Sequence, residues 1–284
     1  MFQAYDIALG AVTGLIVVTT LYFYMRKAIV DEKSSLDPAN FRRFKLIRKT
    51  DISHNTRLFR FGLKTPKSIL GLPIGKHLYV QAQIGGGQIT RPYTPISTND
   101  DMGYFDLLIK VYPQGKMSQY LDNLEIGDSI LVKGPQGRFT YNGLGQYDMG
   151  PRGHSVATHI GMLAGGTGIT PMYQVIRAIL DNPNDTTQMS LVFGNVEERD
   201  ILMREQLEQF QERSPFFKVY HTLNNSPDGW SFGKGFVTSE MIKEHMPPPG
   251  PSTLILVCGP KPFVDGMIAA LIALGYTDKM IYKF

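Results

Sequence analysis

The sequence predicts an N-terminal transmembrane helix, then an antiparallel β-barrel domain, then an α/β domain built on a parallel sheet. Three observations predict this order. An uncharged apolar run lies near the N-terminus, a middle region alternates apolar with other residues, and a C-terminal region alternates strand-like runs with helical patterns. A chain of 284 residues is long enough for two domains that each have their own core.

The first element is a candidate membrane anchor. Residues 7–25 carry no charge and are mostly apolar, and a helix of about 19 residues spans the hydrocarbon layer of a bilayer. Arg26 and Lys27 follow directly, which by the positive-inside rule places the rest of the chain in the cytosol. We therefore expect an uncleaved anchor over 1–27 and a polar linker over 28–40. A cleaved signal peptide and a soluble buried helix are the alternatives, and the missing basic N-terminal region disfavours the first.

The second element is the barrel, which we expect over residues 41–141. Apolar side chains recur at every second position along 78–84 and 105–111, and glycine turns separate such runs. This pattern is typical of an antiparallel barrel. One helix is expected around 118–124. Residues 142–159 contain several glycines without clear periodicity, and we interpret them as an interdomain linker.

The third element is the α/β domain, expected over residues 160–284. Alternation of strands and helices implies a parallel sheet with right-handed crossovers, and ligands of such sheets bind beyond the carboxyl ends of the strands. The expected strands are 160–164, 189–194, 216–221 and 254–258, and the expected helices are 171–181, 200–212, 238–245 and 262–273.

A glycine-rich turn follows the first of these strands. Residues 165–171 read Gly-Gly-Thr-Gly-Ile-Thr-Pro. Glycines allow backbone to approach a diphosphate, and the free amides at a helix N-terminus attract the anion. Pro171 suits the first helical turn, where a missing N–H costs little. The spacing is not the G-x-G-x-x-G of a Rossmann fingerprint, so a plain glycine turn before a helix is the alternative.

A second motif lies in the barrel region. Residues 91–97 read Arg-Pro-Tyr-Thr-Pro-Ile-Ser. Arg91 supplies a forked cation that matches phosphate geometry, Tyr93 a flat face, and two further side chains supply hydroxyls. A flat, diphosphate-bearing ligand needs that mixture. The alternative is an exposed arginine in an edge strand. Weaker signals of the same kind are Gly-Lys-Met-Ser at 115–118 and Cys-Gly-Pro at 258–260.

These four motifs, in this order, resemble the NADH–cytochrome b5 reductases, in particular membrane-anchored fungal forms within the ferredoxin–NADP reductase superfamily. The resemblance covers roughly residues 38–284. It implies an FAD-binding barrel, an NADH-binding α/β domain, and electron transfer from NADH through FAD to cytochrome b5 or a similar haem protein. Two alternatives stay open: a flavin reductase for another external one-electron acceptor, as in nitrate-reductase-like systems, and a nucleotide-binding module without turnover.

The resemblance also implies individual roles. Arg91 is expected at the FAD diphosphate, and Thr94 near the flavin N5 atom, where hydride arrives. The expected catalytic residues are Thr94, Thr167 and Cys258, the last as a contact of the nicotinamide and not as a nucleophile. The expected cofactor-binding residues are Arg91, Pro92, Tyr93, Thr94, Ser97, Lys110, Tyr112, Gly115, Lys116, Met117, Ser118, Gly165, Gly166, Thr167, Gly168, Pro171, Asp200, Cys258, Gly259 and Pro260.

Several of these assignments have local alternatives. Lys110 could be a solvated strand lysine, Ser118 a helix N-cap, and Cys258 a buried structural residue. Asp200 aligns with the acid by which the family favours NADH, because a carboxylate repels the 2′-phosphate of NADPH. Arg199 and Arg204 lie nearby and could meet such a phosphate. One departure from the family pattern is Phe263, where methionine is usual.

Composition limits the remaining function classes. A single cysteine excludes intramolecular disulfides and a cluster held by several cysteines, and no Cys/His array suggests zinc, so we expect no metal. The net charge of +4 could favour an acidic partner or a membrane surface, whereas no basic block with interleaved aromatics suggests nucleic acid. We expect a monomer. The anchor fits the endoplasmic reticulum or the mitochondrial outer membrane, and the sequence does not choose between them or fix the acceptor.

Overall fold

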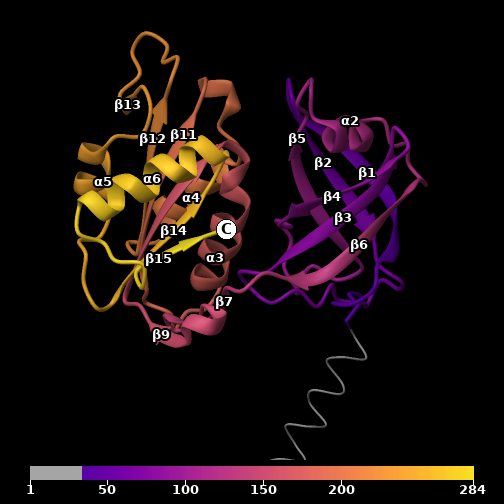
Figure 1. The fold of residues 1–284 in the computed structure, drawn as a ribbon, viewed down its shortest axis with the longest axis horizontal. Helices are drawn as coiled ribbons and strands as arrows, with labels where there is room; N and C mark the ends of the chain where they lie inside the picture. Colours follow the sequence, from indigo (N-terminus) through magenta and orange to yellow (C-terminus); the bar gives the residue numbers. More distant parts are fainter. Residues whose placement is uncertain (1–33) are drawn as a thin grey trace, which may run out of the picture.

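A computed structural model describes residues 34–284, which form two domains lying side by side (Figure 1). The first domain is an antiparallel barrel and the second is a parallel sheet covered by helices. The predicted anchor over 1–27 lies outside the described residues, as do residues 28–33 of the predicted linker. Within residues 34–284 no helix has the length and apolar character needed to cross a membrane.

The barrel has six strands in the order β4-β3-β6-β1-β2-β5, and all the neighbouring pairs are antiparallel. Its core contains Phe59, Phe61 and Phe105, which are fully buried. The backbone N–H of Ile96 donates to the carbonyl of Asp106 at 3.0 Å, which joins the chain after β4 to β5. The strands are β1 (Arg42–Ser53), β2 (Thr56–Gly62), β3 (His77–Ile84), β4 (Gly87–Tyr93), β5 (Tyr104–Lys110) and β6 (Ser129–Gln136). The helix α2 (Lys116–Asp122) begins two residues before its expected start.

The segment 142–159, which we interpreted as an interdomain linker without clear periodicity, forms most of a small antiparallel sheet. Its strands are β7 (Thr140–Gly143), β8 (Gln146–Asp148) and β9 (His154–Val156), with η1 (Gly150–Arg152) between the last two. These strands are too short for alternation to be visible. The Tyr141 hydroxyl donates to Asp185 at 2.6 Å and accepts from the Gly145 amide at 2.8 Å. The small sheet is thereby fastened to the second domain.

The second domain has a six-stranded parallel sheet in the order β13-β12-β11-β10-β14-β15, which confirms the predicted fold class. The two edge strands were not predicted because they span two and three residues. The strands are β10 (His159–Gly165), β11 (Gln188–Asn195), β12 (Phe217–Leu223), β13 (Gly233–Lys234), β14 (Thr253–Cys258) and β15 (Ile281–Lys283). The helices are η2 (Gly166–Gly168), α3 (Ile169–Leu180), η3 (Glu198–Asp200), α4 (Arg204–Arg213), α5 (Ser239–His245) and α6 (Lys261–Ala273).

The predicted helix over 200–212 begins later than expected. Residues 198–200 form η3 instead, closed by reciprocal hydrogen bonds between Glu197 and Asp200. Met203 then adopts a left-handed conformation, with φ of 57°, before α4 starts. The turn breaks the helical register at this point, and apolar periodicity does not report such a break.

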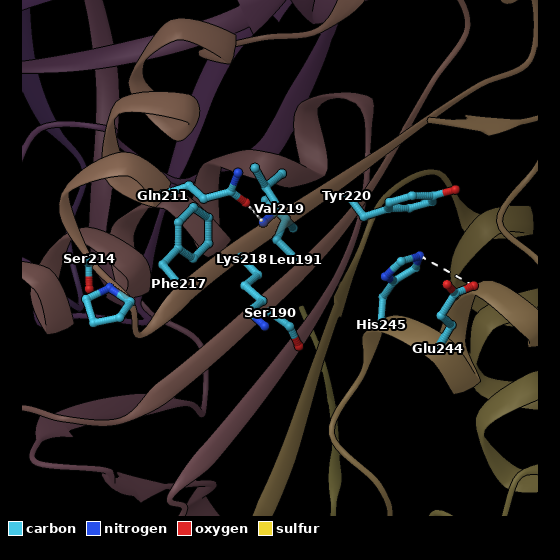
Figure 2. Close-up of a pocket in the computed structure, with 11 residues that line it drawn as sticks. Ser190, Leu191, Gln211, Ser214, Phe217, Lys218, Val219, Tyr220, Glu244 and His245 are labelled. Carbon is cyan, nitrogen blue, oxygen red and sulfur yellow. Dashed lines mark hydrogen bonds and ion pairs between the residues drawn. The ribbon is translucent and has the colours of Figure 1, made fainter. Parts of the chain in front are cut away.

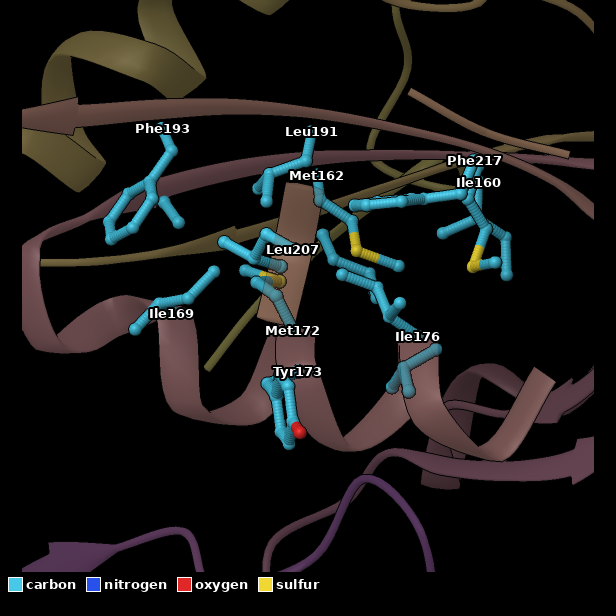
Figure 3. Packing of buried hydrophobic residues seen from close by; sticks show 14 of the residues in the cluster. Ile160, Met162, Ile169, Met172, Tyr173, Ile176, Leu191, Phe193, Leu207 and Phe217 are labelled. Carbon is cyan, nitrogen blue, oxygen red and sulfur yellow. The ribbon is translucent and has the colours of Figure 1, made fainter. Parts of the chain in front are cut away.

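Helix α3 is the central packing element of the second domain. Its predicted apolar positions Met172, Val175, Ile176 and Ile179 are fully buried. They pack with side chains of β10 and β11 in one continuous cluster (Figure 3). The clustered side chains labelled in the figure are Ile160, Met162, Ile169, Met172, Tyr173, Ile176, Leu191, Phe193, Leu207 and Phe217.

The opposite side of α3 faces the barrel and carries polar contacts to it. The backbone N–H of Gly75 donates to Gln174 Oε1 at 2.6 Å, and Gln174 is buried. Asp101 pairs with Arg177 at 3.1 Å. These contacts set the position of α3, and of the glycine turn ahead of it, relative to the barrel.

We expect Gln174→Met to weaken the domain interface, because it leaves the buried Gly75 amide without its acceptor. The cost should be about 1–3 kcal/mol. At roughly 2–4 °C per kcal/mol for a chain of this size, the thermal midpoint should fall by several degrees. Differential scanning calorimetry would measure this. Gln206→Met, on the exposed face of α4, is the matched control. Equal midpoints for the two variants would contradict the importance of the Gly75 contact.

Candidate active site

The glycine turn and Cys258 lie together at the carboxyl edge of the parallel sheet. Strands β10 and β14 are neighbours with Ala164 opposite Cys258, so the segments after them emerge side by side. A Cβ placed on Gly168 would lie 2.2 Å from the carbonyl oxygen of Cys258, closer than any side chain can approach. Gly166 has φ of +54° and faces open space. Only glycine therefore permits this pairing of loops.

Helix α3 begins immediately after this turn, at Ile169, with Pro171 in its first turn. Its first amides have no acceptor within the helix, and its dipole adds partial positive charge at the same end. Thr167 is half-buried beside these amides. Phe263 stands over the glycines: a Cβ on Gly259 would lie 2.7 Å from its ring. The turn, the helix end and this aromatic wall form a site suited to a diphosphate.

The barrel contributes the other wall of the site. The turn η2 packs against β5, so the glycines lie next to the barrel. On β4, Arg91 and Pro92 are exposed, and within residues 34–284 the Arg91 guanidinium has no carboxylate partner. Tyr93 is half-buried, and burial raises its pKa to about 12. Arg91 is thus an available cation beside the uncharged aromatic ring of Tyr93. Thr94, the next residue after Tyr93, is half-buried.

The loop leading into α2 is braced by its own side chains. Ser118 Oγ accepts from the Tyr112 amide at 3.1 Å and donates to the Gly115 carbonyl at 2.9 Å. Gly115 is the N-cap residue, so Ser118 is not a helix cap. Met117 is buried in the barrel core, whereas Lys116 is exposed. The first-turn amides of α2 have no acceptor within the helix and are the groups left to bind a ligand.

Ser97 makes a hydrogen bond inside the barrel. It is buried, and its Oγ accepts from the Asp106 amide at 3.0 Å. This hydrogen bond lies beside the contact that joins the chain after β4 to β5. The side chain of Ser97 therefore holds the barrel together behind the exposed part of its motif.

Two predicted residues from different domains form an ion pair. Lys110 Nζ lies 2.8 Å from Asp200 Oδ1, and the side chains are 16% and 6% exposed. Asn55 donates to the same oxygen at 3.5 Å, and the Glu197 amide donates to Oδ2 at 3.1 Å. Burial is the strongest single influence on Asp200 and raises its pKa, but the hydrogen bond and charge of Lys110, with the hydrogen bonds from the Glu197 amide and Asn55, together keep the pKa below its ordinary value. Lys110 is therefore not a solvated strand lysine.

A pocket of about 260 Å³ lies beyond the carboxyl ends of β11 and β12. Glu198, Arg204 and Trp230 line it. Arg204 pairs with Glu198 at 2.5 Å and with Glu208 at 2.8 Å. Sequence reasoning did not select this pocket, although the rule that ligands bind at carboxyl edges points to the loop after β12.

Asn195 is another residue that sequence reasoning missed. It ends β11 at the same edge of the sheet and is buried. Its Nδ2 has no hydrogen-bond partner among the described residues. An unsatisfied buried donor costs free energy, so Asn195 is a candidate donor to a ligand bound at this edge.

A larger groove, of about 570 Å³, lies at the opposite, amino edge of the sheet (Figure 2). In this view Tyr220 and His245 lie on one side and Phe217 and Gln211 on the other. None of the predicted site residues lines this groove. The candidate active site is therefore the seam between barrel and sheet, and not this groove.

The Cys258 side chain is partly buried at that seam. Burial raises the pKa of its thiol to about 12, so the thiolate is absent at physiological pH. This agrees with the expectation that Cys258 is not a nucleophile. A neutral thiol at the end of β14 can instead shape the wall against which a ring lies.

Fold and site together define an oxidoreductase that uses a flavin and a nicotinamide nucleotide. Residues 43–141 match the oxidoreductase FAD-binding domain family, and residues 162–268 match the oxidoreductase NAD-binding domain family. The exposed Arg91 cation and the glycine approach to Cys258 fit these two cofactors.

The relatives make the assignment narrower. An NADH-cytochrome b5 reductase 1 of Dictyostelium discoideum is 49% identical over 252 residues, covering 89% of this chain and 84% of that protein. The human NADH-cytochrome b5 reductase 1 is 45% identical over 295 residues, covering 98% and 96%. The cytochrome b5 reductase domain of Ulva prolifera nitrate reductase superimposes with a TM-score of 0.84 at 36% identity, covering 88% and 100%. The chain belongs to the NADH–cytochrome b5 reductase family and uses FAD and NADH.

We expect Gly168→Ala to disrupt the nucleotide site without loss of flavin, because the new methyl group would collide with the Cys258 carbonyl. The KM for NADH should rise at least about tenfold, equivalent to about 1.4 kcal/mol. Steady-state kinetics with ferricyanide and the flavin absorbance would test this. Gly266→Ala in α6, where a Cβ meets nothing within 4 Å, should leave the KM unchanged. A normal KM in Gly168→Ala would refute the close-approach argument.

The raised pKa of Cys258 predicts slow alkylation. Because the thiol stays protonated below about pH 12, iodoacetamide should modify it far more slowly than a free cysteine at pH 8, and the rate should rise with pH. Mass spectrometry of the intact native protein would follow the reaction. A rate that reaches a plateau near pH 8.5 would indicate an ordinary, unshifted thiol.

Proposed function

We propose that this chain transfers electrons from NADH through FAD to cytochrome b5. The observation that carries the proposal is the meeting of two sets of groups at one interdomain seam. The barrel supplies Arg91 and the loop before α2, and the sheet supplies the glycine turn and Cys258. Named relatives of similar length support the acceptor.

FAD, when bound, supplies the chemistry: it accepts a hydride and releases electrons singly. The chain holds the reactants in place. Arg91 and the amides of residues 116–118 would hold the FAD diphosphate, and Tyr93 would lie against the flavin. The glycine turn would hold the diphosphate of the nucleotide. Thr94, Thr167 and Cys258 would then limit where the nicotinamide ring lies, so orientation is the main contribution of the protein.

Preference for NADH over NADPH is also part of the proposal. Arg204 is bound to Glu198 and Glu208, and Arg199 to Glu197 at 2.8 Å. Each arginine is paired with a carboxylate, which lowers the positive charge that a 2′-phosphate would meet. Glu198, Asp228 and Arg204 line the pocket beyond β11, so its ionised side chains carry a net negative charge. These carboxylates support discrimination against the phosphorylated nucleotide.

The proposal includes a membrane anchor at residues 1–27, with the catalytic domains facing the cytosol at the endoplasmic reticulum or the mitochondrial outer membrane. The uncharged run over 7–25 supports it. Attachment to the membrane of a membrane-bound acceptor would raise the effective concentration of the two proteins. The proposed catalytic unit is a monomer.

We expect Arg91→Ala to weaken FAD binding about ten- to a hundredfold, because a charge-assisted contact contributes about 1.5–3 kcal/mol. Flavin fluorescence during dilution would measure the affinity. Chromatography of flavin released by heat should show FAD. FMN as the main species would contradict the assignment of Arg91 to a dinucleotide diphosphate.

We expect Lys116→Glu to slow the reduction of cytochrome b5 while ferricyanide reduction continues, because an exposed cation beside the site steers an acidic partner. The rate of the unmodified protein should fall with ionic strength, since screening shortens charge interactions to about 8 Å near 0.15 M salt. Lys218→Glu, in the groove at the opposite sheet edge, makes the same charge change and is the control. If Lys116→Glu lowers the rates of cytochrome b5 and ferricyanide reduction equally at full flavin content, then Lys116 serves the cofactor and not the partner.

A further inference from the structure

The Lys110–Asp200 pair joins the two domains at the edge where the nucleotide would enter. Lys110 ends β5 of the barrel, and Asp200 ends η3, directly after the carboxyl end of β11. The 2.8 Å contact is largely shielded from water, so screening by salt is weak there. Breaking one partner of such a pair is costly because the remaining charge stays buried.

The hydrogen bonds of the Asp200 carboxylate are already made by the protein itself. Oδ1 accepts from Lys110 and Asn55, and Oδ2 accepts from the Glu197 amide. His54 Nε2 lies 3.8 Å from Oδ1. With the side chain 6% exposed, little of this carboxylate is open to a ribose hydroxyl.

Lys110, in contrast to Asp200, has hydrogen-bonding groups that the protein does not use. Its ammonium group has three N–H donors, and among the described residues one of them is used, by Asp200. The other two donors have no partner among the described residues, and the strand that Lys110 ends, β5, packs against the glycine turn η2. A cation held from one side by a carboxylate presents its other donors in a defined direction.

From this geometry we infer that Asp200 is a positioning residue: it orients Lys110 toward the pyridine nucleotide and does not itself read the ribose. The inference rests on the proposed use of NADH and on the expectation from the sequence that Lys110 is a cofactor-binding residue. Discrimination between NADH and NADPH then belongs to the pocket that contains Glu198, and not to Asp200. The pair also holds η3, at the carboxyl edge of the sheet, against strand β5 of the barrel.

The test uses the full-length flavin-loaded protein and four variants: Asp200→Asn, Asp200→Glu, Lys110→Met and the double variant Asp200→Asn with Lys110→Met. Asparagine keeps an oxygen acceptor for the Glu197 amide but removes the charge that holds Lys110. The measurements are kcat and KM for NADH and NADPH with ferricyanide, and the Kd of NAD⁺ by titration calorimetry. Flavin content and the thermal midpoint report folding.

Asp101→Asn is the matched control. It breaks a second interdomain ion pair, 3.1 Å long, between a barrel loop and α3. If loss of an interdomain charge pair alone weakened nucleotide binding, this variant would also raise the KM. Because the Gly75–Gln174 hydrogen bond still holds α3 and its glycine turn against the barrel in this variant, we expect its KM and Kd to stay close to the unmodified values.

Asp200→Asn should raise the KM for NADH and the Kd of NAD⁺ about tenfold, equivalent to about 1.4 kcal/mol, with kcat within about threefold and the NADH-to-NADPH ratio unchanged. Asp200→Glu should recover part of the affinity. Lys110→Met should show the same shift, and adding Asp200→Asn to it should change little, because the two residues act as one unit.

Three results would overturn the inference. A smaller difference in kcat/KM between NADH and NADPH in Asp200→Asn would show that Asp200 contacts the ribose and discriminates between the nucleotides. A further tenfold loss in the double variant would show that the two residues act independently. A lower KM in Asp200→Asn would show that Asp200 competes with the nucleotide for Lys110. Failure of the unmodified protein to oxidise NADH would instead refute the proposed function and leave the geometry of the pair untouched.

Discussion

The arrangement of the molecule depends on the burial of helix α3 between the parallel sheet and the barrel. One side of the helix packs into the apolar cluster of β10 and β11, and the other side is bound to the barrel through Gln174 and Arg177. The glycine turn at the start of α3 therefore has a fixed place relative to β4 and β5. Hydride transfer between two bound cofactors requires contact distance, and one shared helix can impose it on two domains.

The charges at the seam divide into two kinds. Arg91 and Lys116 are exposed and have no carboxylate partner within residues 34–284. Lys110, Arg199 and Arg204 are each held by a neighbouring carboxylate. Free cations can bind a ligand or attract a partner, whereas a paired cation is fixed in direction and reduced in net charge.

Much of the site was predictable because its motifs are local. Residues 91–97, 115–118 and 165–171 carry their chemistry in adjacent positions, and the glycine turn follows a strand whose apolar run is visible in the sequence. The meeting of this turn with Cys258 could also be expected, since neighbouring parallel strands end at the same edge. The hydrogen bonds of Ser97 and Ser118 could not be predicted from the sequence, because their partners Asp106 and Tyr112 are brought to them by the closure of the barrel and of a loop.

The sequence by itself determined the two-domain architecture and the identity of the cofactor motifs, because periodicity and turn chemistry act over a few neighbouring residues. Only the tertiary structure decided that Lys110 meets Asp200, 90 positions away, and that residues 142–159 form a sheet. It also decided that, among residues 34–284, Asn195 Nδ2 has no hydrogen-bond partner at the carboxyl edge of the sheet. Each of these depends on how two separately folded cores dock, and docking is set by side chains that no local pattern links.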